Sequence, residues 1–242
     1  MEKIVELGLE RFKEQNRQKV HFVNDKTANN LLNDIDNNPH VYVLACLMDR
    51  QIKAEKAWII PQKIFDIFTT NEIDKLSEID KNNFVEEFEN NKLHRFNKDM
   101  AEIFYAAIQH IKNKYNYDAS KIWKDKPSSA LVIYRFLEFK GCGIKIATMA
   151  ANILARQYKI EFSDYYSIDI SPDTHIMRVM KRMGYVSNDS NREMVIYKAR
   201  ELYPKFPGII DSSCWEIGRQ FCKPKNPDCD NCIIKEQCKK II

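Results

Sequence analysis

The strongest chemical signal in this sequence is a group of cysteines near its end. The stretch CWEIGRQFCKPKNPDCDNCIIKEQC, residues 214–238, holds five of the seven cysteines in the 242-residue chain. The last four are spaced C-x6-C-x2-C-x5-C, at Cys222, Cys229, Cys232 and Cys238. Zinc sites of four cysteines usually use two C-x-x-C pairs on separated segments, and this stretch has one such pair. Because the four irons of a cubane cluster present ligand positions farther apart than a single ion does, the unequal spacing favours an iron-sulfur cluster.

Two glycines mark a candidate phosphate-binding turn in the segment LEFKGCGIKIA, residues 137–147. Gly141 and Gly143 lie on either side of Cys142, between two predicted helices. Their missing side chains let a phosphate approach the backbone N–H groups that begin the second helix. Together with Lys140, these three residues are the expected DNA contacts of the turn. A plain helix connector is the alternative interpretation, since glycine often ends helices.

Lys145 is the candidate nucleophile, because it lies two residues after Gly143, in the first turn of the second predicted helix. A lysine gains nothing there from the positive end of the helix dipole. The dipole and partial burial would both favour the neutral amine, which is the form that attacks carbon and forms Schiff bases.

Asp173 is the candidate acid or base. It precedes Thr-His-Ile and could simply cap the helix that follows, but a capping carboxylate has a second oxygen that can face a pocket. There it could accept a proton or stabilise the positive charge that builds on a sugar as a base departs. Asp169 is the competing carboxylate, and His175 is interpreted as structural.

Helices must position these residues, because apolar side chains recur three and four positions apart along most of the chain and only six glycines interrupt it. The predicted helices lie within residues 2–15, 39–68, 97–115, 129–140, 144–158, 173–185 and 191–203. Start signals agree with them: Pro172 and Asp173 precede one helix, and serine or asparagine caps occur in KPSSA and SNDSN. Strand signals are absent, so the sequence predicts an all-α fold.

Composition and charge limit the class of protein. Apolar residues make up 44% of the chain, yet the longest apolar run, VYVLACLM at 41–48, is too short to cross a bilayer, and the first residues include acidic side chains. We therefore expect a soluble, intracellular and cytoplasmic protein, in which cysteines serve metal binding or catalysis before disulfides. The net charge is +4, and residues 121–160 hold eight Lys and Arg against Asp125 and Glu138, which predicts one basic face.

Three motifs together resemble one family. The run from Trp215 to Cys238 is similar to the C-terminal cluster loop of endonuclease III, a DNA glycosylase of the helix-hairpin-helix (HhH-GPD) superfamily. That family also carries a hairpin of the form L-P-G-V-G-R-K-T-A, followed by V-D-T-H-I. In this sequence LEFKGCGIKIA at 137–147 and SPDTHIMRV at 171–179 occur in the same order, ahead of the same cysteine loop.

The resemblance implies a bifunctional DNA glycosylase and AP lyase of base-excision repair. Its partner would be double-stranded DNA that contains a damaged base, most simply an oxidised pyrimidine, or an abasic site, and the protein would act as a monomer. Lys145 would attack C1′, expel the base and cleave the strand by β-elimination, with Asp173 assisting, and the cysteine loop would hold a 4Fe–4S cluster. Because the base must be flipped out of the duplex, Gln51, or Arg50 as the second choice, is expected to fill the gap.

The same resemblance implies two helical domains that flank a DNA-binding groove. A six-helix barrel would span residues 40–157, with the helix-hairpin-helix at 131–155. Residues 1–39 and 158–242 would form a discontinuous second domain, which ends in the cluster loop at 222–238.

Departures from the family pattern leave the substrate open. Lys140 replaces the proline expected before Gly141, and 27 residues separate Lys145 from Asp173, more than the usual connection. The aromatic residues of this longer connection could stack on a flipped base or belong to the core: Tyr158, Phe162, Tyr165 and Tyr166. Two other functions remain open. One is an adenine-mismatch or other monofunctional glycosylase, and the other is a non-catalytic iron-sulfur module that binds DNA.

Overall fold

The computed structural model describes residues 2–13, 16–17 and 19–241, and every regular element in these residues is a helix. The predicted all-α fold is confirmed. The helix predicted at 2–15 is present as α1 (Lys3–Lys13), and residues 14 and 15 of that prediction lie outside the described residues. Residues 1, 18 and 242, which belong to the predicted second domain, also lie outside them. Within the described part of the chain, no helix combines the length and the apolar character needed to cross a membrane.

The chain packs into two compact units, each made of segments that are distant in the sequence. The hairpin unit consists of 17–127 and 134–150, and the C-terminal unit consists of 1–16, 128–133 and 151–242. Helices α9 (Ser129–Leu137) and α10 (Ile144–Arg156) contribute residues to both units. The predicted barrel at 40–157, with its helix-hairpin-helix at 131–155, stays a prediction.

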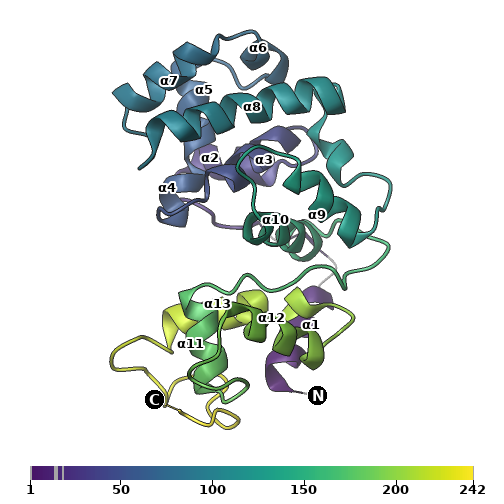
Figure 1. The fold of residues 1–242 in the computed structure, drawn as a ribbon, viewed down its shortest axis with the longest axis vertical. Helices are drawn as coiled ribbons and strands as arrows, with labels where there is room; N and C mark the ends of the chain where they lie inside the picture. Colours follow the sequence, from purple (N-terminus) through teal and green to yellow (C-terminus); the bar gives the residue numbers. More distant parts are fainter. Residues whose placement is uncertain (1, 14–15, 18, 242) are drawn as a thin grey trace. The chain divides into compact units, whose positions relative to one another are not determined.

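The hairpin unit is built around one entirely buried helix, α3. Its elements before the hairpin are α2 (Lys26–Asn33), α3 (Pro39–Met48), α4 (Ala54–Trp58), α5 (Ile60–Phe68), α6 (Ile73–Ser77), α7 (Lys81–Asn90), α8 (Asn97–Tyr115) and the short 3-10 helix η1 (Ala119–Ile122). Every residue of α3 is buried, because its sequence PHVYVLACLM offers no polar face to water. It packs against α8, and α7 runs beside α8, as Figure 1 shows. From α3, Tyr42 donates its hydroxyl to the carbonyl of Ala150 at 2.8 Å, which ties α10 to this core.

The stretch 39–68, predicted as helical throughout, is interrupted in the structure. α3 ends at Met48 and α4 begins at Ala54, so residues 49–53 form a loop. Gln51 in this loop has a φ of +55°, a left-handed conformation through which a right-handed helix cannot continue. The prediction is wrong here because apolar spacing continues across the loop and conceals the break.

Two helices that the sequence analysis does not predict, α2 and α7, are marked most clearly by their caps. Asp25 accepts the amide of Ala28 at the start of α2, and Asp80 accepts the amide of Asn82 at the start of α7. Each buries only one pair of residues four positions apart, Ala28 and Leu32 in α2 and Phe84 and Phe88 in α7, so the apolar pattern is too short to predict either helix.

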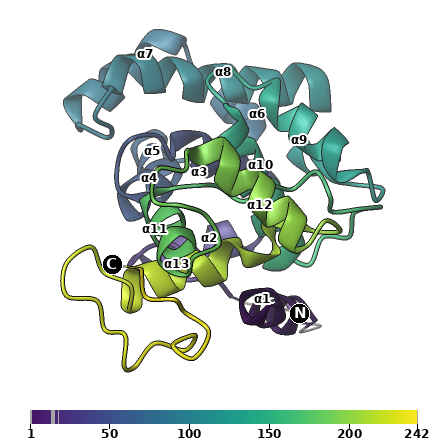
Figure 2. The same cartoon turned by 60° about the horizontal axis from the view of Figure 1, so that its bottom comes forward.

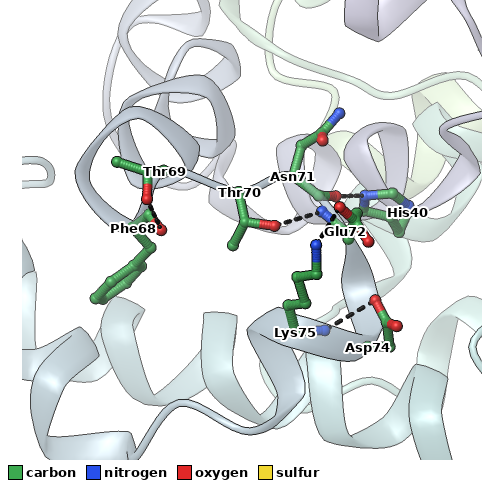
Figure 3. A network of polar contacts seen from close by, with 8 residues as sticks. All are labelled: His40, Phe68, Thr69, Thr70, Asn71, Glu72, Asp74 and Lys75. Carbon is green, nitrogen blue, oxygen red and sulfur yellow. Dashed lines mark hydrogen bonds and ion pairs between the residues drawn. The ribbon is translucent and has the colours of Figure 1, made fainter.

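The loop between α5 and α6 is held against α3 by a buried histidine (Figure 3). His40 Nε2 donates to the carbonyl of Asn71 at 2.8 Å, and burial lowers the pKa of His40 to about 4, so the ring is neutral at pH 7. Along the loop, Thr70 Oγ1 accepts the amide of Glu72, and Lys75 donates its ammonium to the Glu72 carboxylate. The entry of α3 is therefore fixed to the chain that follows α5.

The C-terminal unit packs helices closely at glycine positions. It contains α1, α11 (Thr174–Arg182), α12 (Arg192–Leu202), the 3-10 helix η2 (Pro207–Ile210) and α13 (Asp211–Gln220). A β-carbon at Gly218 of α13 would lie 2.7 Å from Cβ of His175, so a larger residue would push α13 away from α11. Figure 2 shows the long loop that leaves α13, and its end returns to α11, where the amide of Ile241 donates to the carbonyl of Arg182 at 3.1 Å.

Candidate functional site

The hairpin turn between α9 and α10 depends on Gly141. This residue has a φ of +79°, and a β-carbon there would lie 2.5 Å from Cδ1 of Ile103 on α8. The amide of Cys142 then donates to the carbonyl of Phe139 at 3.0 Å, which closes the turn. A side chain at position 141 would therefore be strained by its backbone angle and would also clash with α8.

Gly143 serves the turn differently. Its carbonyl accepts the amides of Ile146 and Ala147, both at 3.0 Å, so α10 begins here. Among the described residues, nothing lies within 4 Å of the place where its β-carbon would be. The fold does not need glycine at this position for space, and the exposed first turn of α10 is open to a ligand.

Lys140 and Cys142 flank these glycines in contrasting ways. Lys140 is exposed and forms an ion pair with Glu102 of α8, at 3.0 Å. Because the pair is exposed, it contributes little to stability. Cys142 is partly buried, and burial raises the pKa of its thiol to about 12, so the thiol is protonated at neutral pH.

Lys145 lies in the first turn of α10, as the sequence predicts. Its expected partial burial is wrong, because Ile146 and Ala147 take the inward face of this turn and leave Lys145 exposed. Lys145 belongs to the hairpin unit, whereas Asp173 belongs to the C-terminal unit.

Asp173 caps α11 with one of its two carboxylate oxygens. Oδ1 accepts the amides of His175 at 2.8 Å and Ile176 at 2.9 Å, so the capping interpretation is confirmed. Oδ2 takes no part in the cap. The partly buried side chain lies at the wall of an open hollow whose other lining residues are Pro172, Thr174, Met177, Arg178, Lys181, Arg182, Asn188, Arg192 and Ile241. The cap fixes the carboxylate at this hollow.

The competing carboxylate, Asp169, is fully engaged elsewhere. Both of its oxygens accept hydrogen bonds from Arg200, Oδ1 from Nε at 2.8 Å and Oδ2 from Nη2 at 2.7 Å. Asp169 is buried and its pairing is bidentate, which is a structural arrangement. The geometry favours Asp173 over Asp169 as the carboxylate available for chemistry.

Arg178 connects the first turn of α11 to the cysteine loop, a role that sequence reasoning missed. Its Nε donates to the carbonyl of Cys222 at 2.6 Å, and its Nη2 donates to the carbonyl of Gly218 at 2.8 Å. Its Nη1 donates to the carbonyl of Thr174 at 3.2 Å, directly after Asp173. The turn that holds Asp173 is thereby tied to the first cysteine of the loop.

The structure brings the four predicted cysteine ligands to one hollow. It is lined by Cys222, Cys229, Cys232 and Cys238 together with Val179, Arg182, Met183, Ile217, Phe221, Asp228, Ile234, Lys235 and Lys240. The pKa of Cys232 is raised, first by burial and also by the charges of the other three thiols, which are close enough to interact with it. All four cysteines are free thiols.

Hydrogen-bond donors already face two of these sulfurs. Nη1 of Arg182 donates to Sγ of Cys222 at 3.5 Å, and the amide of Lys240 donates to Sγ of Cys238 at 3.4 Å. In the described residues, no three side chains of His, Cys, Asp or Glu lie close enough together to hold one metal ion.

Gln51 and Arg50, the two candidates for filling a gap in DNA, occupy the exposed loop between α3 and α4. The left-handed backbone of Gln51 is unusual for a residue with a side chain. Gln51 is one of ten residues other than glycine with a positive φ in the described part of the chain, so this backbone angle marks a turn and the role of Gln51 stays a prediction.

The aromatic residues of the long connection before Asp173 divide between core and surface. Tyr158 and Phe162 are buried, and Tyr165 stacks on Phe206 with ring centroids 5.1 Å apart. Tyr166 is 61% exposed. The core interpretation is thus confirmed for the first two, and Tyr166 is the one of the four that is available to a ligand.

Comparison with known proteins places the chain beside endonuclease III. No family model matches the sequence. Endonuclease III of Thermotoga maritima is 35% identical over 69 residues, 28% of this chain and 32% of the relative, and that of Rickettsia felis is 30% identical over 104 residues, 42% of this chain and 43% of the relative. The matched stretches thus span less than half the length of these curated relatives.

Solved structures match over almost the whole chain. A trapped endonuclease III–DNA covalent intermediate matches with a TM-score of 0.61 and 15% identity, covering 98% of this chain and 93% of that one. A thermostable thymine-DNA glycosylase matches with a TM-score of 0.64 and 14% identity, covering 98% and 94%. The fold is therefore the all-helical fold of these DNA glycosylases. In sequence, the chain is similar to endonuclease III over part of its length, and in fold it is similar to these solved structures.

Proposed function

We propose that this chain is a DNA glycosylase with AP lyase activity, which removes a damaged base, with oxidised pyrimidines as the favoured class, from double-stranded DNA. The observation that carries the proposal is Lys145, an exposed lysine in the first turn of α10, two residues after the open position at Gly143. A helix start preceded by an uncrowded glycine suits a DNA phosphate, and the same turn then presents an amine to the neighbouring sugar.

The chemistry of Lys145 follows from its amine. Nζ forms a bond to C1′ of the flipped nucleotide while the bond between C1′ and the base breaks, and the base leaves with that electron pair. The sugar ring then opens to give a Schiff base between Nζ and C1′. Loss of a proton from C2′ expels the 3′ phosphate, and water finally releases the lysine. Strand cleavage without an added metal ion follows from this sequence of steps.

Asp173 supports the same reaction with the oxygen that its cap leaves unused. A fixed carboxylate stabilises the positive charge that develops on the sugar as the base departs, and it can accept a proton from the attacking amine. The rigid cap matters because a carboxylate already held in place needs no reorganisation during the reaction.

A panel of duplexes, each with one defined lesion, tests this function. The protein is incubated with every duplex, once in the presence of borohydride and once without it. Excision together with a trapped protein–DNA adduct supports the proposal. Excision without an adduct supports the monofunctional alternative, including the adenine-mismatch type. Binding to an abasic duplex with neither product supports the non-catalytic module.

We assign the four-cysteine pocket to a 4Fe–4S cluster. Four free thiols that line one hollow suit a cluster that is held by four thiolates, and their unequal spacing in the sequence favours it. The N–H donors of Arg182 and Lys240 suit thiolate sulfurs. Once bound, the cluster would fix the loop at 222–238, so its contribution is to folding and positioning.

Anaerobically purified protein is expected to be brown and to contain about four irons per chain. Cys232→Ala is expected to lose the iron and to unfold at a lower temperature, because a missing ligand removes the cross-link of the loop. Iron and zinc content and thermal melting measure both effects. Cys142→Ala is the matched control and should keep its iron. A colourless protein with one zinc would overturn the assignment.

Gln51→Gly is expected to separate stability from function in the α3–α4 loop. Glycine adopts the left-handed backbone without strain, so folding stability should stay the same or rise by up to about 1 kcal/mol. If the Gln51 side chain fills the space of a flipped base, excision should fall by about tenfold, since unstacking costs a few kcal/mol. Denaturant unfolding and single-turnover excision measure the two effects.

The control for this experiment keeps the strain and removes the same side chain. Gln51→Ala should lose excision as Gln51→Gly does, without any gain in stability. If both Gln51 variants excise at the parental rate while Arg50→Ala loses most of its excision activity, Arg50 is the residue that fills the space of the flipped base.

A further inference from the structure

The charged side chains that line the hollow beside Asp173 are mostly cationic. Four of its residues carry a positive charge, Arg178, Lys181, Arg182 and Arg192, and Asp173 is the one carboxylate among the described residues that line it. A concave surface with this balance attracts anions more strongly than the overall charge of +4 suggests.

Two of these cations, Arg178 and Arg182, donate hydrogen bonds to backbone carbonyls of the protein itself. Arg178 donates to the carbonyls of Cys222, Gly218 and Thr174. Arg182 donates to the carbonyl of Lys223 at 2.7 Å and to that of Pro224 at 3.0 Å. Their charges still act on the hollow, but their guanidinium groups already serve to hold the cysteine loop.

The other two cations are better placed for a ligand. Lys181 donates to the carbonyl of Asn188 at 2.7 Å, an exposed and neutral partner, and the charge of Lys181 also acts on the exposed carboxylate of Asp189, which does not line the hollow. Arg192 is exposed at the first position of α12, where the positive end of the helix dipole adds to its own charge.

We infer that this hollow is a subsite for a phosphodiester of the DNA strand, next to the nucleotide on which Asp173 acts, with Lys181 and Arg192 as its direct contacts. This inference rests on the proposed function. A phosphate near Asp173 would otherwise be repelled by the carboxylate, and the cations of the hollow offset that repulsion. Anchoring the strand here fixes the position of the sugar relative to a carboxylate that is itself fixed by its cap.

Equilibrium binding over a series of salt concentrations tests the subsite. The probe is a duplex with a single tetrahydrofuran abasic-site analogue, which binds but cannot react. Lys181→Ala and Arg192→Ala should each lower the slope of log Kd against log salt by about 0.9 and weaken binding at 0.1 M salt by about fivefold to tenfold. Lys198→Ala is the matched control on α12, because Lys198 is paired with Glu201 and does not line the hollow; it should keep the parental slope.

Neutral methylphosphonate replacements locate the contact. Replacing one flanking phosphate should weaken binding of the parental protein, and the double variant Lys181→Ala/Arg192→Ala should be insensitive to that replacement. Parental salt slopes in both single variants, or equal sensitivity of the parental protein and the double variant at every phosphate, would overturn the subsite. Failure of the proposed function shows separately, as absence of excision and trapping by the parental protein. Unchanged thermal melting confirms that the variants fold.

Discussion

Lys145→Ala is expected to form no borohydride-trapped adduct with an abasic duplex, while its affinity for that duplex stays within a few fold of the parental value. Trapping requires a Schiff base between an amine and C1′, and the mechanism assigns that amine to Lys145 alone. Binding should persist because the turn uses backbone groups after Gly141 and Gly143, which the substitution does not alter. Since Lys145 is exposed, its removal creates no cavity in the core.

Lys140→Ala provides the matched control for this result. Lys140 is also an exposed lysine of the hairpin, five residues earlier, and it lies before the turn, outside the first turn of α10. It should trap at the parental rate and weaken binding modestly. An adduct of parental yield in Lys145→Ala would show that another amine reaches C1′, and the lysines of 121–160 would then be tested in turn.

The features of the site that could be predicted are those that depend on residues close together in the sequence. Asp173 caps α11 because a helix start needs an acceptor for its first amides, and that requirement is visible in P-D-T-H-I. Gly141 adopts a positive φ for a similarly local reason, the tight turn between two helices. The cysteine spacing also predicted one pocket, because a short loop limits how far its thiols can separate.

The parts that the sequence did not predict depend on residues that meet only in the folded chain. The hydrogen bonds of Arg178 to Cys222 and of Arg200 to Asp169 join positions far apart in the sequence, and no local sequence pattern indicates either pair. The exposure of Lys145 also depends on which face of α10 meets the core. Propensity and periodicity describe one element at a time, so they do not resolve such contacts.

Asp173→Asn is expected to slow base excision by about a hundredfold or more, the scale for losing a positioned acid, base or charge stabiliser. Asparagine is as good an N-cap as aspartate, so Oδ1 should still accept the amides of His175 and Ile176 and the melting temperature should change little. Asp173→Ala removes the cap as well and should cost about 1 kcal/mol of stability in addition. Single-turnover excision and thermal melting of the two variants separate the charge of Asp173 from its capping role.

The lyase step gives this prediction a further test. On a preformed abasic site no base has to leave, so Asp173→Asn should slow strand cleavage less than it slows excision on a verified lesion. Equal losses in both steps would mean that Asp173 acts mainly on the amine of Lys145 and not on the departing base. Excision at the parental rate would remove Asp173 from the mechanism, and Asp169 would then have to leave its pairing with Arg200 in order to act.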